Sequence, residues 1–274
     1  MAPAESAPRV RRIAVGIEYD GRDYCGWQAQ ATARNVQRVL EQALGRVADE
    51  PVLLTSAGRT DAGVHARAQV AHFDTLARRR AGAWVLGANA CLPRDVSLRW
   101  ACGVADHFHA RYSALARTYR YLILNRSARS ALADGRALLV HRPLDVKAMN
   151  EAAGALIGEH DFSAFRSSEC QARSPIRELR SLQVERSGDW VSIEVTANAF
   201  LHHMVRNIVG LLLAIGMRRL GPEQARVQLE SRDRAAGAPT AAAHGLYLWR
   251  VDYPPQFGLP TDSAMIHDPL SPPA

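Results

Sequence analysis

The feature that most constrains the fold is the alternation of two kinds of segment along the chain. Residues 11–21, RRIAVGIEYDG, alternate apolar with other side chains and end at an Asp-Gly pair, which is typical of a half-buried strand followed by a turn. Apolar residues at helical spacing then follow Asn35, a competent helix N-cap: Val36, Val39, Leu40, Ala43, Leu44 and Val47. The chain therefore combines strands and helices.

The same order of elements occurs twice. In the first half we expect strands at 51–58, 68–74 and 97–104, with a helix at 83–90. In the second half we expect strands at 118–124, 176–186, 190–198 and 245–253, with helices at 146–158, 201–217 and 222–230. Most strands are sequential neighbours, so the order predicts an α+β fold with mostly antiparallel sheets and helices packed on one face.

The predicted domain organisation is two α+β halves between two tails. The first half covers residues 12–106 and the second covers 107–254, and their likeness lies only in the order of elements. Residues 1–11 and 255–274 are rich in Pro, Ala and Ser, which indicates flexible ends.

The charge of the chain favours an anionic partner. Its 274 residues carry a formal net charge of +7 with a pI near 9.7, and Lys147 is the single lysine among 34 basic residues. Guanidinium groups bind phosphate through two hydrogen bonds and stack on bases. Nucleic acid, acidic lipid headgroups and phosphorylated substrates all fit this charge.

Several classes of protein are disfavoured by what the sequence contains. The four cysteines form no CxxC pair, which argues against a zinc knuckle or a small disulfide framework. The N-terminal residues lack a signal-peptide core, and the apolar run 208–217 is too short to span a membrane, so we expect a soluble, cytoplasmic protein. No Gly-rich phosphate loop appears, so no nucleotide cofactor is expected.

Residues 56–73, SAGRTDAGVHARAQVAHF, form the first candidate site. Asp61 lies in a bend bracketed by Gly58 and Gly63, and an alternating run leaves it. From these residues alone Asp61 is either a turn-former or a chemical reagent, and Arg59 is either a solvated charge or an anion holder.

Two further stretches carry candidate residues. In the strand at 116–125, Tyr119 shares a face with arginine and a second tyrosine, a combination suited either to stacking bases or to packing over the core. In 198–210, Arg206 lies among apolar residues and needs an anionic partner. The adjacent His202 and His203 are expected to point in different directions, so no metal site is predicted.

Together these stretches resemble the tRNA pseudouridine synthases of the TruA type. The matching blocks are GIEYDGRDYCGWQ (16–28), AGRTDAGVHARAQVAHF (57–73), FHARYSALARTYRY (108–121), ANAFLHHMVRNIVG (197–210) and GLYLWRVDYP (245–254). The resemblance implies a pseudouridine-synthase-type fold with an active-site cleft between the halves. It also implies a homodimer that isomerises uridine to pseudouridine in tRNA without a cofactor, at anticodon-arm positions 38, 39 and 40.

The resemblance assigns roles to five residues. Asp61 falls on the catalytic aspartate and Tyr119 on the tyrosine that packs against the target base. Arg206 falls on the basic residue that pairs with the catalytic carboxylate. Leu246 matches an apolar wall of the uracil pocket, and Arg59 matches an arginine that helps hold the target nucleotide out of its stack.

Two other functions are compatible with parts of the sequence. A non-catalytic RNA-binding protein or RNA chaperone explains the charge and the aromatic residues, but it gives Asp61 and Arg206 no joint purpose. A metal-assisted phosphoryl transferase requires clustered carboxylates, and no acidic residue lies close to Asp61 in sequence: the next one along the chain is Asp74, and Glu50 precedes it. The sequence does not decide whether Asp61 attacks C1′, attacks the ring or abstracts the C2′ proton.

Overall fold

The computed structural model describes residues 10–30 and 33–260, and these residues form two compact units. One unit comprises residues 10–115 and 251–260, and the other comprises 116–250. Most of each predicted tail lies outside the described residues. Within them, Arg11 already begins the first strand, and Pro255–Phe257 forms the 3-10 turn η3.

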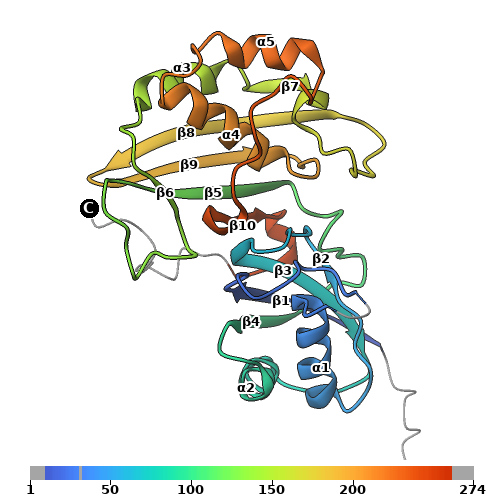
Figure 1. The fold of residues 1–274 in the computed structure, drawn as a ribbon. Coiled ribbons are helices and arrows are strands. Elements are labelled where there is room, and N and C mark those ends of the chain that lie inside the picture. The colour runs from blue at the N-terminus through green and yellow to red at the C-terminus, as the bar shows by residue number, and fades with distance from the viewer. Residues whose placement is uncertain (1–9, 31–32, 261–274) are drawn as a thin grey trace, which may run out of the picture. The chain divides into compact units, whose positions relative to one another are not determined.

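The first unit is an antiparallel sheet with two helices (Figure 1). Strand β1 (Arg11–Tyr19) lies between β3 (His65–Thr75) and β4 (Val96–Val104), and the short β2 (Thr55–Ser56) pairs with β3. Helices α1 (Val36–Ala48) and α2 (Ala81–Cys91) contact each other, and α2 packs against β4. The antiparallel pairing of β1 with β3 places Tyr19, the last residue of β1, opposite Ala66, near the Asp61 region.

Local sequence explains why α1 forms where it does. The Asn35 side chain accepts a hydrogen bond from the Arg38 backbone N–H at 3.0 Å, so it caps the helix as predicted. Leu40 and Leu44 are fully buried on the inner face. Asp49 takes a left-handed conformation with φ 60° and ends the helix.

The second unit is a larger sheet, with its helices gathered on one side (Figure 1). Its strand order is β10 (Leu246–Asp252), β5 (Ala116–Asn125), β9 (Trp190–Ala197), β8 (Ile176–Ser187) and β7 (Gly158–Asp161). The pairs from β5 to β7 are antiparallel, and β6 (Leu138–Val140) pairs with β5 in parallel. Helix α3 (Val146–Gly154) contacts β8, α4 (Met204–Gly216) and α5 (Gln224–Ser231). The predicted α+β fold with mostly antiparallel sheets is confirmed.

Three predicted elements are markedly shorter in the structure than expected. The strand expected at 51–58 is reduced to Thr55–Ser56, and the Glu41 carboxylate instead accepts the Leu54 N–H at 2.9 Å. The helix expected at 146–158 ends at Gly154, because Gly158 (φ 113°) already begins β7. The helix expected from residue 201 begins at Met204, since His203 is left-handed with φ 62°.

Candidate active site

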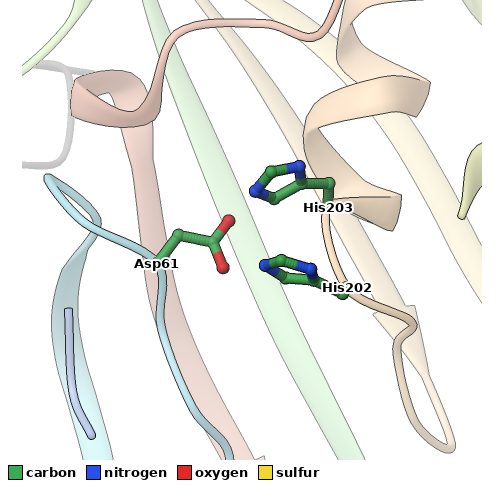
Figure 2. Close-up of side chains that lie close together, drawn as sticks. All are labelled: Asp61, His202 and His203. Carbon is green, nitrogen blue, oxygen red and sulfur yellow. The ribbon is translucent and has the colours of Figure 1, made fainter. Parts of the chain in front are cut away.

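Asp61 lies in a tight bend between β2 and β3. The Val64 N–H donates to the Asp61 carbonyl oxygen at 3.1 Å, and Gly63 takes a positive φ of 77° to complete the turn. Figure 2 shows the Asp61 carboxylate projecting from this bend. The backbone of Asp61 therefore closes the turn, while the side chain carries the negative charge.

A second loop, residues 20–27, is hydrogen-bonded to the backbone of this bend. The Trp27 N–H donates to the Thr60 carbonyl at 3.0 Å, and the Gly63 N–H donates to the Tyr24 carbonyl at 3.2 Å. Gly26 has φ 86°, and a Cβ placed there would lie 2.7 Å from the Thr60 oxygen. Because any larger residue would push against the bend, the close approach of the two loops requires glycine at position 26.

A buried pair of hydroxyls fixes the residue that precedes Asp61. The Tyr19 hydroxyl lies 2.7 Å from the Thr60 Oγ1, and the two residues are only 4% and 7% exposed. Burial raises the pKa of Tyr19 far above its usual range, although hydrogen bonds with Thr60 and Gln69 oppose the shift. Tyr19 is therefore a neutral phenol that anchors Thr60 to β1.

The other end of the bend is tied to the turn that follows β1. The buried His65 places its Nδ1 3.1 Å from the Gly21 N–H and 3.2 Å from an Asp20 carboxylate oxygen. Burial raises the pKa of Asp20, but hydrogen bonds from His65 and Arg22 outweigh it and hold that pKa well below its usual range. Asp20 is consequently ionised at neutral pH and holds the His65 ring in place.

Arg59 is exposed, two residues before Asp61. An exposed guanidinium beside a rigid bend can contact an RNA phosphate or base without first breaking a buried ion pair. Its expected role in holding the target nucleotide stays a prediction.

Tyr119 lies in the middle of β5, opposite Val195 of β9. Its side chain is buried, at 8% exposure, and its ring meets the Phe200 ring edge-on, with centroids 5.1 Å apart at 88°. On the opposite face of the same strand, the Arg120 guanidinium stacks 3.9 Å from the Trp249 ring centroid. The alternation expected along this strand is present.

Arg206 belongs to the first turn of α4 and is anchored to the segment leading into β10. Its Nε donates to the Ala241 carbonyl at 2.8 Å, and the Ala241 N–H donates to the Arg206 carbonyl at 3.1 Å. One residue on, the Ala242 carbonyl accepts the Tyr121 hydroxyl at 2.9 Å. Burial raises the pKa of Tyr121, and the charge of Arg206 partly opposes this.

Leu246 is buried where this segment enters β10, directly after the 3-10 turn η2 (Ala243–Gly245). A Cβ at Gly245 would lie 2.7 Å from the Tyr121 ring, so the turn packs tightly against β5. Tyr119, Arg206 and Leu246 thus come from three elements of one unit, and hydrogen bonds and ring packing join those elements around Tyr121.

The expectation that His202 and His203 point in different directions is wrong. Their ring centroids are 4.1 Å apart and their planes differ by 38°, and Figure 2 shows the rings side by side at the start of α4. The expectation assumed a regular helix or strand, but His203 is left-handed. A non-glycine residue in this region is strained, and such strain concentrates at functional sites.

The residues that hold the Asp61 bend were missed by the sequence reasoning. Tyr19, Thr60 and His65 lie inside recognised blocks, yet nothing local shows that they contact one another. The available signal was the glycines of DGRDYCGW, which indicate close backbone approach.

Among the described residues, no helix has both the length and the apolar character that crossing a membrane requires.

Comparison with known proteins gives one consistent result. The family described as "tRNA pseudouridine synthase" matches residues 16–113 and 152–254. A protein of Nitrosococcus oceani named "tRNA pseudouridine synthase A" is 56% identical over 91% of this chain and 96% of its own length. Proteins of the same name from Methylococcus capsulatus and Photobacterium profundum are 54% and 52% identical, over 94% and 91% of this chain and 95% and 96% of their own.

Proposed function

Because the chain belongs to the tRNA pseudouridine synthase family, we propose that the Asp61 carboxylate is its central catalytic group. As a member of this family the protein is an isomerase that acts on tRNA. The observation that carries the proposal is the rigid bend that presents Asp61, whose backbone is bonded to residues 20–27 inside the matched range.

The reaction sets specific demands on the protein. The bond between uracil N1 and ribose C1′ breaks, the ring turns, and a bond forms between C5 and C1′. The C5 hydrogen leaves as a proton and N1 gains one, so no oxidant, reductant or added group is needed. A carboxylate that attacks or removes a proton serves this sequence, provided that it is ionised and held in position.

Tyr119, Arg206, Leu246 and Arg59 supply the remaining roles in the proposal. A stacked ring at Tyr119 offsets part of the roughly few kcal/mol needed to take a base out of its stack. The cationic Arg206 is the charge partner of the catalytic carboxylate. Leu246 excludes water from the reacting sugar, and Arg59 holds the displaced nucleotide.

We also assign the substrate uridines to the anticodon stem-loop and the working form to a homodimer, both on the resemblance of the five sequence blocks. Basic residues that neutralise RNA phosphates make tRNA binding weaken steeply with added salt.

The test is the Asp61→Asn variant, which keeps the shape of the side chain and removes its charge. We expect pseudouridine formation on an unmodified tRNA transcript to fall by at least about a thousand-fold, with tRNA affinity within a few-fold of wild type. Tritium release from C5-labelled uridine measures the rate, and carbodiimide-resistant adducts map the modified positions.

Full activity of Asp61→Asn would remove Asp61 from the mechanism, and adducts outside the anticodon stem-loop would overturn the assigned uridines. If the wild-type protein bound tRNA tightly without changing any base, the non-catalytic alternative would replace the proposal.

A further inference from the structure

An exposed aromatic stack lies in the first unit, apart from the residues to which a role is assigned above. Tyr112 is 77% exposed, and its ring lies over the His109 imidazole with centroids 4.3 Å apart and planes within 29°. The Arg111 guanidinium is 5.8 Å from the centroid of the same ring. Residues 109–112, which we call the platform, therefore combine a flat aromatic surface with a positive charge.

The platform is built on a rigid turn. The His109 Nδ1 accepts the backbone N–H groups of Arg111 and Tyr112, both at 3.2 Å. The His109 N–H donates to the Ser113 Oγ at 3.0 Å, and the Ser113 N–H donates to the His109 carbonyl at 2.8 Å. Because these bonds fix the backbone beneath the ring, docking a flat ligand orders little further structure.

The turn is also anchored from below, through Ala110. The Ala110 N–H donates to the Nδ1 of the buried His72 at 3.1 Å, and the Tyr253 hydroxyl donates to the Ala110 carbonyl at 2.6 Å. The His72 and His109 rings meet edge-on with centroids 4.9 Å apart. These contacts with buried residues fix the position of the turn that carries the Tyr112 ring.

The charge of the platform suits RNA. Burial and the nearby Arg12 lower the pKa of His109, so its imidazole is neutral at physiological pH. A neutral stacked pair beside a guanidinium offers a surface for the face of a base and a cation for the adjoining phosphate. Unpaired nucleobases are recognised in this way in single-stranded and looped RNA.

We propose that Tyr112 stacks on an unpaired nucleobase of the RNA substrate, with Arg111 directed at a neighbouring phosphate. This is a binding contact and not a catalytic one. It rests on the proposed function only in taking tRNA as the source of that base, and it does not depend on the role of Asp61.

The experiment compares Tyr112→Ala with Tyr112→Phe in the full chain, using an unmodified tRNA transcript. Loss of one base stack corresponds to about 5- to 150-fold weaker binding, so we expect Tyr112→Ala to raise the Kd and the KM for tRNA by a factor in this range. The kcat at saturating tRNA stays unchanged. Tyr112→Phe keeps the ring and stays within about two-fold of wild type.

The matched control is Leu132→Ala, an apolar truncation at a residue that is 89% exposed in the other unit. We expect this variant to bind tRNA as the wild type does. Photocrosslinking with 4-thiouridine-substituted tRNA should label a peptide containing residues 107–113 in the wild type and lose that label in Tyr112→Ala.

The proposal is overturned if Tyr112→Ala binds as tightly as wild type, if Tyr112→Phe loses as much affinity as Tyr112→Ala, or if the crosslink is absent. The last two outcomes would indicate a hydroxyl contact or a protein-docking surface. These binding results are the same whether Asp61→Asn loses turnover or keeps it. Failure of the Tyr112 proposal can therefore be told apart from failure of the Asp61 proposal.

Discussion

Removing the Tyr19 hydroxyl tests whether the bend at Asp61 is held from β1. In Tyr19→Phe the ring keeps its volume in the core, but the Thr60 Oγ1, which belongs to a residue only 7% exposed, loses its partner at 2.7 Å. An orphaned buried polar group costs about 1–3 kcal/mol, so we expect a loss of this size in the free energy of unfolding. The midpoint of thermal unfolding should fall by about 2–4 °C per kcal/mol.

A double-mutant cycle separates this hydrogen bond from packing. Thr60→Val removes the other hydroxyl with little change of shape, and the single variant is expected to be destabilised as well, because the buried Tyr19 hydroxyl then keeps only its contact with Gln69. With both hydroxyls gone neither is left buried without the other, so Tyr19→Phe with Thr60→Val should lose less than the sum of the single changes, by about 0.5–3 kcal/mol.

The same variants report on catalysis. Thr60 directly precedes Asp61, and a displacement of about 1 Å at a reacting group lowers a rate by about a hundred-fold. We therefore expect Tyr19→Phe to lower the kcat for tritium release while the KM for tRNA stays within about two-fold. Unchanged stability together with unchanged kcat would refute the reasoning, as would stability losses that are strictly additive in the double variant.

Two further predictions concern stability. Burial, assisted by the charges of Arg12 and His109, lowers the pKa of His72 from 6.5 to about 4. As the pH falls, position 72 therefore takes up a proton in the unfolded chain before it does so in the folded one, and the free energy of unfolding should fall through this range by on the order of 2 kcal/mol. Urea titrations of wild type and His72→Phe at several pH values check this. Equal slopes of unfolding free energy against pH in the two proteins would contradict it. Asn35→Ala removes the α1 cap and should cost about 0.5–2 kcal/mol in the same assay, whereas Asn35→Asp should cost less.

The elements that sequence predicts well are those whose signals are local. Strand β1 alternates and stops at an Asp-Gly pair, and α1 follows an N-cap and places its apolar residues on one face. The hairpin of β8 and β9 turns at Gly188, which takes φ 56° as a tight turn requires. In each case the residues that specify the element lie within it.

The elements that sequence misses depend on partners elsewhere in the chain. Strand β7, Gly158–Asp161, is short and polar, and only its pairing with β8 makes it a strand. Strand β6 is three residues long and pairs with β5 in parallel. The left-handed His203 delays the start of α4 and brings two adjacent rings together, and non-glycine residues adopt that conformation too seldom for it to be predicted from sequence.

The candidate active site likewise has features that the sequence predicts locally and features that depend on distant partners. The glycines around Asp61 predict a bend, and the family resemblance singles out the carboxylate within it. The supports of the bend cannot be predicted locally, since Tyr19 and Thr60 are 41 positions apart and meet only because β1 pairs with β3. The amino-acid sequence shows which residues are polar, but not which of them are buried against each other.

The two interpretations of Asp61, turn-former and reagent, concern different atoms of the same residue. The bend is closed by the Asp61 carbonyl, and its neighbours Thr60 and Gly63 are bonded through their backbones to Trp27 and Tyr24. Because these bonds involve no atom of the carboxylate, Asp61→Asn preserves them and the bend keeps its shape. The activity of this variant therefore reports what the carboxylate charge contributes to the reaction, separately from the structure of the bend. Gly26→Ala would do the opposite, by moving the bend while leaving the charge in place.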